Sequence, residues 1–159
     1  MSALLPVFLF LLSSCASSWR GDGPPEILSG TAWTGTNQAR GEVLDMFFGL
    51  SGDCFMEEYE DGSTFETGDM RMIFSYPAEE GSALRDSMLY TGTYTYSRTP
   101  TGVLHDVFHG NVSFYLVNVD TGDSVHNGMS YHNQRFYTVF GDTSYPTDPA
   151  EDSWINSVR

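Results

Sequence analysis

A strict two-residue alternation of side chains is the feature that most constrains this chain. From Met88 to Ser97, methionine, tyrosine and glycine occupy the even positions, whereas leucine, threonine and serine occupy the odd ones. The same period recurs in Met70–Tyr76 and in Glu42–Leu50. Successive side chains of a β-strand point to opposite faces of a sheet, so this period predicts strands with one buried row. No central segment shows the apolar period of a helix over three turns.

Short turns rich in Gly, Asp and Ser separate these segments, as in Asp120–Asp123. The predicted strands are Thr31–Thr34, Glu42–Leu50, Cys54–Tyr59, Met70–Tyr76, Met88–Ser97, Val103–His109, Val112–Val119, Ser124–Tyr131 and Arg135–Phe140. A spacing of about ten residues indicates an antiparallel meander, and about eight strands close naturally into a barrel. Gly92, set in a row of aromatic residues, predicts a bend that lets the sheet curl. The expected fold class is therefore all-β, an antiparallel meander closing into a β-barrel of about eight strands.

Residues 142–159 are expected to form a C-terminal extension with one short helix. Asp148 suits an N-cap, Pro149 the first helical position and Glu151 the third, as in a capping box. Trp154 and Val158, four residues apart, would share the apolar face of this helix.

The N-terminal residues have the pattern expected of an export signal. Leu4–Leu12 is apolar except for Pro6, too short to span a bilayer of about 30 Å but suited to a signal peptide. The run ends in Leu12-Ser13-Ser14-Cys15, which resembles the lipobox of bacterial lipoproteins. That resemblance implies a signal peptide over residues 1–14, a lipid anchor on Cys15 and a place in the bacterial cell envelope, at the outer membrane. The alternative is an ordinary signal peptide cleaved after Ala16. Residues 15–27, with Ser, Gly and a Pro–Pro pair, are predicted to be a flexible tether.

The two cysteines of the chain bear on that prediction. If Cys15 carries lipid, Cys54 has no partner within the chain and is expected to be a free, buried thiol, because a free cysteine behaves as a small hydrophobic side chain.

Composition excludes several functions. The formal net charge is −14, with 21 acidic residues against seven basic ones, all of them arginine. The absence of lysine excludes a Walker A lysine and a Schiff-base lysine. Nucleic acid is not an expected partner, because phosphate contacts need clustered positive charge.

No catalytic or metal-binding pattern stands out. His105 and His109 would lie on one face of a strand but about 13 Å apart at ~3.3 Å per residue, too far to share one metal ion. Gly49-Leu50-Ser51-Gly52 lacks the spacing of a hydrolase nucleophile elbow. We therefore expect no enzyme activity, no cofactor and no metal site.

Two stretches resemble the small lipocalin-like lipoproteins of anaerobic Gram-negative bacteria. These are Leu28-Ser29-Gly30-Thr31-Ala32-Trp33 and Thr91-Gly92-Thr93-Tyr94-Thr95-Tyr96, which match the first strand and a central strand of that family. The resemblance implies a lipocalin-like β-barrel domain over residues 28–141 and no known catalytic residues.

Two classes of function then remain. In the first, a lipid-anchored barrel binds a small apolar ligand. In the second, a solid-cored barrel acts through a strand edge or its acidic surface on an envelope partner. The predicted interior, which would line a ligand cavity or fill a core, comprises Trp33, Phe48, Met72, Phe74, Tyr90 and Tyr94.

Overall fold

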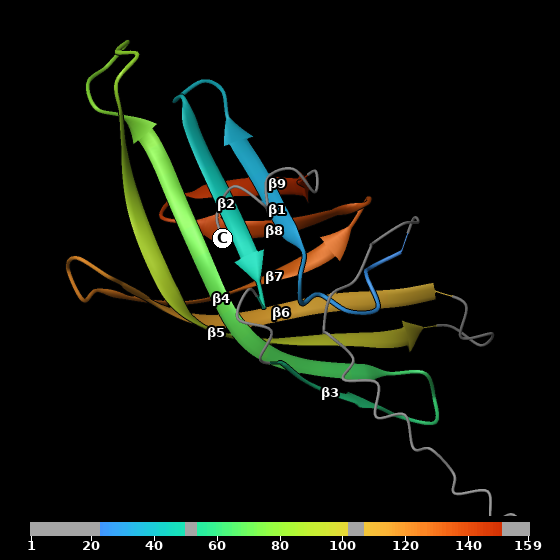
Figure 1. Cartoon of the computed structure of the whole chain (residues 1–159). Helices are drawn as coiled ribbons and strands as arrows, with labels where there is room; N and C mark the ends of the chain where they lie inside the picture. The colour runs from blue at the N-terminus through green and yellow to red at the C-terminus, as the bar shows by residue number, and fades with distance from the viewer. Residues whose placement is uncertain (1–22, 50–53, 102–106, 151–159) are drawn as a thin grey trace, which may run out of the picture.

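Nine antiparallel strands make up the part of the chain that the structure describes (Figure 1). The computed structural model describes residues 23–49, 54–101 and 107–150. The strands are β1 (Ala32–Asn37), β2 (Glu42–Phe48), β3 (Cys54–Glu58), β4 (Thr64–Pro77), β5 (Arg85–Thr101), β6 (Val107–Asn118), β7 (Ser124–His132), β8 (Arg135–Phe140) and β9 (Thr143–Pro149).

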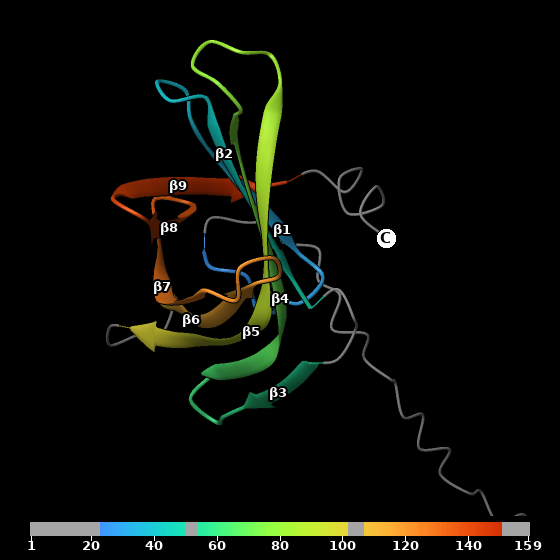
Figure 2. The same cartoon turned by 90° about the vertical axis from the view of Figure 1, so that its left-hand side faces the viewer.

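Eight of these strands close into a barrel. The hydrogen-bonded order is β2-β1-β9-β8-β7-β6-β5-β4-β3, and β2 also pairs with β4, which closes the ring and leaves β3 outside it. The first part of the 14-residue β4 pairs with β3, and its second part pairs with β2. Figure 2 shows β3 beside the lower part of β4, away from the rest of the barrel. The predicted all-β, lipocalin-like barrel of about eight strands is confirmed.

Gly92 allows β5 and β6 to approach closely. It lies opposite Met70 on β4 and Leu116 on β6. A Cβ atom at position 92 would lie 2.0 Å from the carbonyl oxygen of Tyr115, a distance that no side chain tolerates. A glycine is therefore required at this position of the barrel wall by the close approach of the β6 backbone.

The alternating rows are buried largely as predicted. In β5, Tyr90, Tyr94 and Tyr96 are buried, whereas Thr91 and Thr95 between them are exposed. All six residues predicted to lie in the interior are indeed buried. In β2 both rows are buried, since Asp45 and Phe47 are 5% and 1% exposed.

The C-terminal part of the fold differs from its prediction. Asp148 and Pro149, expected to start a helix, belong to β9, which pairs with β8 and, at Trp33 and Thr34, with β1. The barrel needs a strand between β8 and β1, and this pairing overrides the local capping signal. The sheet therefore continues beyond residue 141, and the remainder of the predicted helix lies outside the described residues.

Candidate functional site

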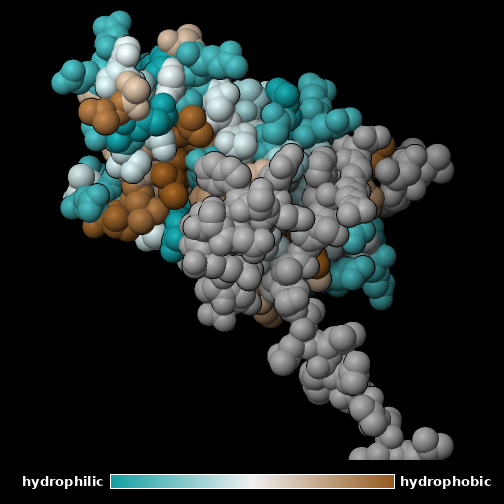
Figure 3. Space-filling view, turned by 45° about the horizontal axis from the view of Figure 1, so that its top comes forward, coloured by the Kyte–Doolittle hydropathy of each residue, from teal (hydrophilic) through white to brown (hydrophobic). Residues whose placement is uncertain are grey.

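A pocket opens at the end of the barrel where the β1–β2 and β4–β5 turns lie. Its volume is about 720 Å³, which is within the range of small-molecule sites. Figure 3 shows hydrophobic surface gathered among hydrophilic surface where the top of the molecule comes forward. The lining includes Ala39, Arg40, Glu42, Phe74, Tyr76 and Met88.

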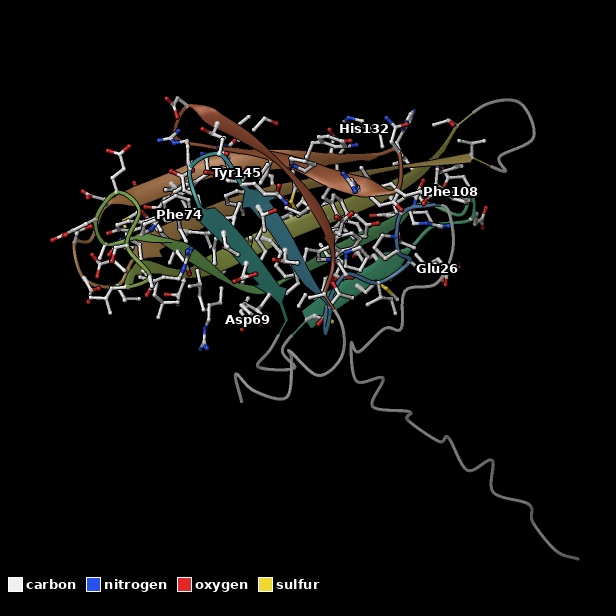
Figure 4. All side chains as sticks on the ribbon, turned by 90° about the horizontal axis from the view of Figure 1, so that it is seen from above. Glu26, Asp69, Phe74, Phe108, His132 and Tyr145 are labelled. Carbon is white, nitrogen blue, oxygen red and sulfur yellow. The ribbon has the colours of Figure 1, made fainter. Side chains whose placement is uncertain are left out.

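Two aromatic rings, those of Phe74 and Tyr76, line this pocket, and further rings pack behind them. The ring of Phe74 stacks with that of Tyr76 at a centroid distance of 5.7 Å and lies 4.8 Å from the ring of Phe140. Tyr145, on β9, meets Phe74 edge-on at 6.3 Å, and the two lie on the same side of the view in Figure 4. Tyr90 packs edge-on against Phe140 behind them. Such rings offer an apolar surface whose faces carry partial negative charge.

Charged groups at the rim are joined in one network. The Arg40 guanidinium contacts Glu42 through Nε at 3.0 Å and Asp142 through Nη1 at 3.2 Å. The Tyr145 hydroxyl donates to the other oxygen of Glu42. Burial, with the nearby Glu42 carboxylate, raises the pKa of Tyr145 to about 12, so this hydroxyl keeps its proton at neutral pH. The hydrogen bonds from Thr143 and Arg40 lower the pKa of Asp142.

The residues predicted to line a cavity divide into two groups. Phe74 lines the pocket, and Tyr90 lies one ring behind it. The other four, which are at most 1% exposed, fill the barrel interior and are Trp33, Phe48, Met72 and Tyr94. Trp33 packs edge-on against Phe136 at 4.7 Å, and Phe48 against Tyr94 at 5.0 Å.

The sequence analysis missed the rim of the pocket. Tyr76 and Met88 belong to the alternating rows that the sequence predicts, but they lie at the ends of β4 and β5 nearest the β4–β5 turn. Their half-buried side chains open onto the pocket because the barrel wall stops there. Arg40 sits in the β1–β2 turn, where no periodic signal exists. Glu42 occupies a buried position at the start of β2, where the alternation predicts an apolar residue.

At the opposite end, the N-terminal segment packs on the barrel. Leu28 and Ser29 are buried, and their backbone N–H groups donate to the Glu66 carboxylate at 2.8 and 2.7 Å. The Tyr94 hydroxyl also donates to this carboxylate. Glu66 is only 1% exposed; burial raises its pKa, and the three hydrogen bonds oppose this shift.

Two residues near the end of the predicted tether are also hydrogen-bonded to the barrel. The Tyr96 hydroxyl donates to the carbonyl of Pro25, and the Arg98 Nε to the carbonyl of Pro24 at 3.3 Å. The prediction of a flexible tether up to residue 27 is therefore wrong for Pro24 and Pro25, because β5 supplies polar side chains that bind their backbone carbonyls.

The prediction of a free, buried Cys54 is wrong. Cys54 is half-buried at the start of β3 and is disulfide-bonded. The chain has one other cysteine, Cys15, which lies outside the described residues.

Neither a metal cluster nor a membrane-spanning helix is found in the described parts of the chain. There, no three His, Cys, Asp or Glu side chains are grouped to hold a metal ion. His105 lies outside these parts, whereas His132 stacks on Tyr137 at 4.0 Å. Nor is any helix within them long and apolar enough to cross a membrane.

Comparisons with family models, curated proteins and solved structures found no match to this chain. Its function is therefore inferred from its own residues.

Proposed function

We propose that this protein is a lipid-anchored protein of the bacterial cell envelope whose β-barrel binds a small apolar ligand at its mouth. The observation that carries the binding function is the 720 Å³ pocket, with Phe74, Tyr76 and Met88 among its lining. Tyr76 and Met88 are only half-buried, so contact with a ligand would remove further apolar surface from water. The site lies at the mouth because aromatic side chains fill the barrel below it.

The polar groups at the rim fit this function. A ligand pocket is generally apolar with a few placed polar groups that orient the ligand. Here Arg40, Glu42 and Tyr145 hold one another in place. Preorganised groups of this kind lose little freedom when a ligand binds.

Blocking the pocket is expected to abolish ligand uptake. Ala39 is exposed in the β1–β2 turn and lines the pocket, so Ala39→Trp would fill the mouth without disturbing the core. We expect the wild type to bind the neutral dye Nile red while native, and Ala39→Trp to bind it about tenfold more weakly or worse, at an almost unchanged melting temperature. Dye fluorescence and thermal unfolding measure the two quantities.

Val107→Trp is the matched control, because it adds the same ring to an exposed residue at the opposite end of the barrel. It should leave dye binding unchanged. If the native wild type binds no dye, or if Ala39→Trp binds it as well as the wild type, the ligand-binding function is wrong.

Failure of that test would favour the second candidate, an interaction protein. Strand β3 pairs only with β4 among the described strands and exposes Phe55 and Met56, which are 58% and 40% accessible. A strand edge of this kind can pair with an extended segment of another chain. Glu57, Glu58 and Glu60 would favour a basic segment.

The lipid anchor makes a separate prediction. Metabolic labelling with an alkyne analogue of palmitate should mark the wild type but not Cys15→Ala, because the lipobox places Cys15 at the site of modification. Several acyl chains would then hold the domain stably on a membrane. Mass spectrometry of the labelled protein would identify the modified residue.

Cys54→Ala is the control for this experiment and should be labelled like the wild type. A sulfur that carries lipid cannot form a disulfide, and the chain has two cysteines, so a lipid anchor on Cys15 and an intrachain disulfide of Cys54 exclude each other. The labelling experiment decides between them. Equal labelling of the wild type and Cys15→Ala, or recovery of Cys15 in a disulfide with Cys54 from cells, would contradict the anchor.

A further inference from the structure

The charged residues around the mouth of the barrel restrict the charge of the ligand, in addition to the apolar character that the lining requires. Seven charged residues lie in or beside the β1–β2, β4–β5 and β8–β9 turns at this end of the barrel. They are Arg40, Glu42, Glu79, Glu80, Arg85, Asp86 and Asp142. Acidic groups predominate among them, as they do in the whole chain with its net charge of −14.

Among the described residues, the arginine that lines the pocket is Arg40, and its charge is already neutralised. Arg40 contacts the carboxylates of Glu42 and Asp142 at 3.0 and 3.2 Å, so it presents no uncompensated positive charge to an anion. Both oxygens of Glu42 are occupied as well, one by Arg40 and the other by the Tyr145 hydroxyl.

Glu80 differs from these paired groups. It lines the pocket from the β4–β5 turn, and within the described residues no hydrogen bond or ion pair engages its carboxylate. The rings of Phe74 and Tyr76 also line this pocket, and aromatic rings attract cations. The apolar wall, the aromatic rings and the free carboxylate therefore complement the same kind of molecule.

We infer that the ligand is an amphiphilic cation, with an apolar or aromatic body against Phe74, Tyr76 and Met88 and an ammonium-type group facing Glu80. This inference rests on the proposed ligand-binding function and adds the charge of the ligand. An anion of the same shape would meet this acidic rim, where Arg40 is paired with two carboxylates and Arg85, outside the lining, donates to the carbonyl of Gly41. A neutral molecule would gain only from burial of its apolar surface.

Three probes that share one apolar body test the charge. They are 4-phenylbutylammonium, 4-phenylbutan-1-ol and 4-phenylbutyrate, titrated calorimetrically at neutral pH and low salt into the intact protein. We expect the ammonium to bind about fivefold to tenfold more tightly than the alcohol, and the carboxylate to bind most weakly. Raising the salt concentration should reduce the difference between the ammonium and the alcohol, because exposed charges are screened.

A variant tests whether Glu80 causes the preference for the ammonium over the alcohol. Glu80→Gln should weaken ammonium binding about threefold and leave binding of the alcohol unchanged. Glu60→Gln, which removes the same charge from the β3–β4 turn outside the pocket, should leave both unchanged.

The outcomes separate the two proposals. If the alcohol binds and the carboxylate binds as tightly as the ammonium or more so, the inferred charge is wrong and the apolar pocket stands. An unchanged preference in Glu80→Gln would likewise overturn the assigned cation position. If none of the three probes binds and Nile red is not taken up either, the ligand-binding function is wrong together with the inference.

Discussion

Replacing Gly92 with alanine is expected to lower the free energy of unfolding by about 3 kcal/mol or more. The new Cβ would lie 2.0 Å from the Tyr115 carbonyl oxygen and 3.0 Å from the Leu116 Cα, both backbone atoms of β6. A flexible side chain could move away from such a contact, but a backbone atom cannot move alone. β6 is held by pairing with β5 on one side and β7 on the other, so relief of the clash would disturb several pairs of the barrel wall.

Urea unfolding followed by circular dichroism measures this effect. Gly23→Ala is the control, since a Cβ there meets nothing within 4 Å, and it should change the free energy of unfolding by less than about 0.5 kcal/mol. Gly128→Ala should have an intermediate effect, because its Cβ would lie 2.9 Å from the Val112 carbonyl oxygen. Wild-type stability in Gly92→Ala would show that β5 and β6 do not approach closely at this position.

Much of the barrel could be predicted because alternation is a local signal. In β5, each tyrosine of the even row is buried and the threonines between them are exposed, so the pattern alone shows which face points inward. The same applies to Met70, Met72 and Phe74 in β4. A structural role for Gly92 could be predicted because a missing side chain in an aromatic row is itself part of the pattern.

The first part of β4 was missed because its inward row is polar. Thr64 and Glu66 occupy inward positions where a local pattern expects apolar side chains. The hydrogen-bond donors to the Glu66 carboxylate include the Leu28 N–H and the Tyr94 hydroxyl, which are 38 and 28 residues away in the sequence. Only folding brings these donors to the carboxylate, so no local window contains the signal.

Strand β9 and the rim of the pocket were missed for a similar reason. Tyr145 and Thr147 alternate with exposed or half-buried residues, but Pro146 and Pro149 interrupt the strand pattern. Tyr145 reaches Glu42 across 103 residues of sequence. The sequence therefore predicts the aromatic content of the interior, whereas the position of the pocket depends on where each strand ends.

Removing the Glu66 carboxylate should destabilise the protein by about 3 kcal/mol or more and loosen the N-terminal segment. In Glu66→Leu, the N–H groups of Leu28 and Ser29 and the Tyr94 hydroxyl would lose their acceptor, and each buried unsatisfied group costs about 1–3 kcal/mol. Replacing a buried charge by an apolar group can be neutral when its partners are replaced as well. Here two of the partners are backbone groups, which no substitution removes.

Two milder variants complete this series. Glu66→Gln keeps one carbonyl oxygen as an acceptor and should be less destabilised, whereas Tyr94→Phe removes a single donor and should lose about 1 kcal/mol. Hydrogen exchange at the Leu28 and Ser29 amides should accelerate in Glu66→Leu more than the change in global stability accounts for. Exchange at wild-type rates relative to global unfolding would contradict the role of Glu66 in holding this segment.

The pH dependence of Glu66→Gln shows which effect dominates at the buried carboxylate. Burial raises the pKa of Glu66 in the native state above its ordinary value of 4.5. At pH values between 4.5 and this raised pKa, Glu66 therefore binds more protons in the native state than in the unfolded state. The contribution of Glu66 to the free energy of unfolding must therefore increase as the pH falls through the raised pKa toward 4.5. Since the glutamine variant lacks this contribution, the stability difference between the wild type and Glu66→Gln should widen over the same range. The other acidic groups titrate in both proteins, which removes most of their effect from the comparison. A difference that narrows instead would mean that the hydrogen bonds from Leu28, Ser29 and Tyr94 outweigh burial and hold the pKa of Glu66 below its ordinary value.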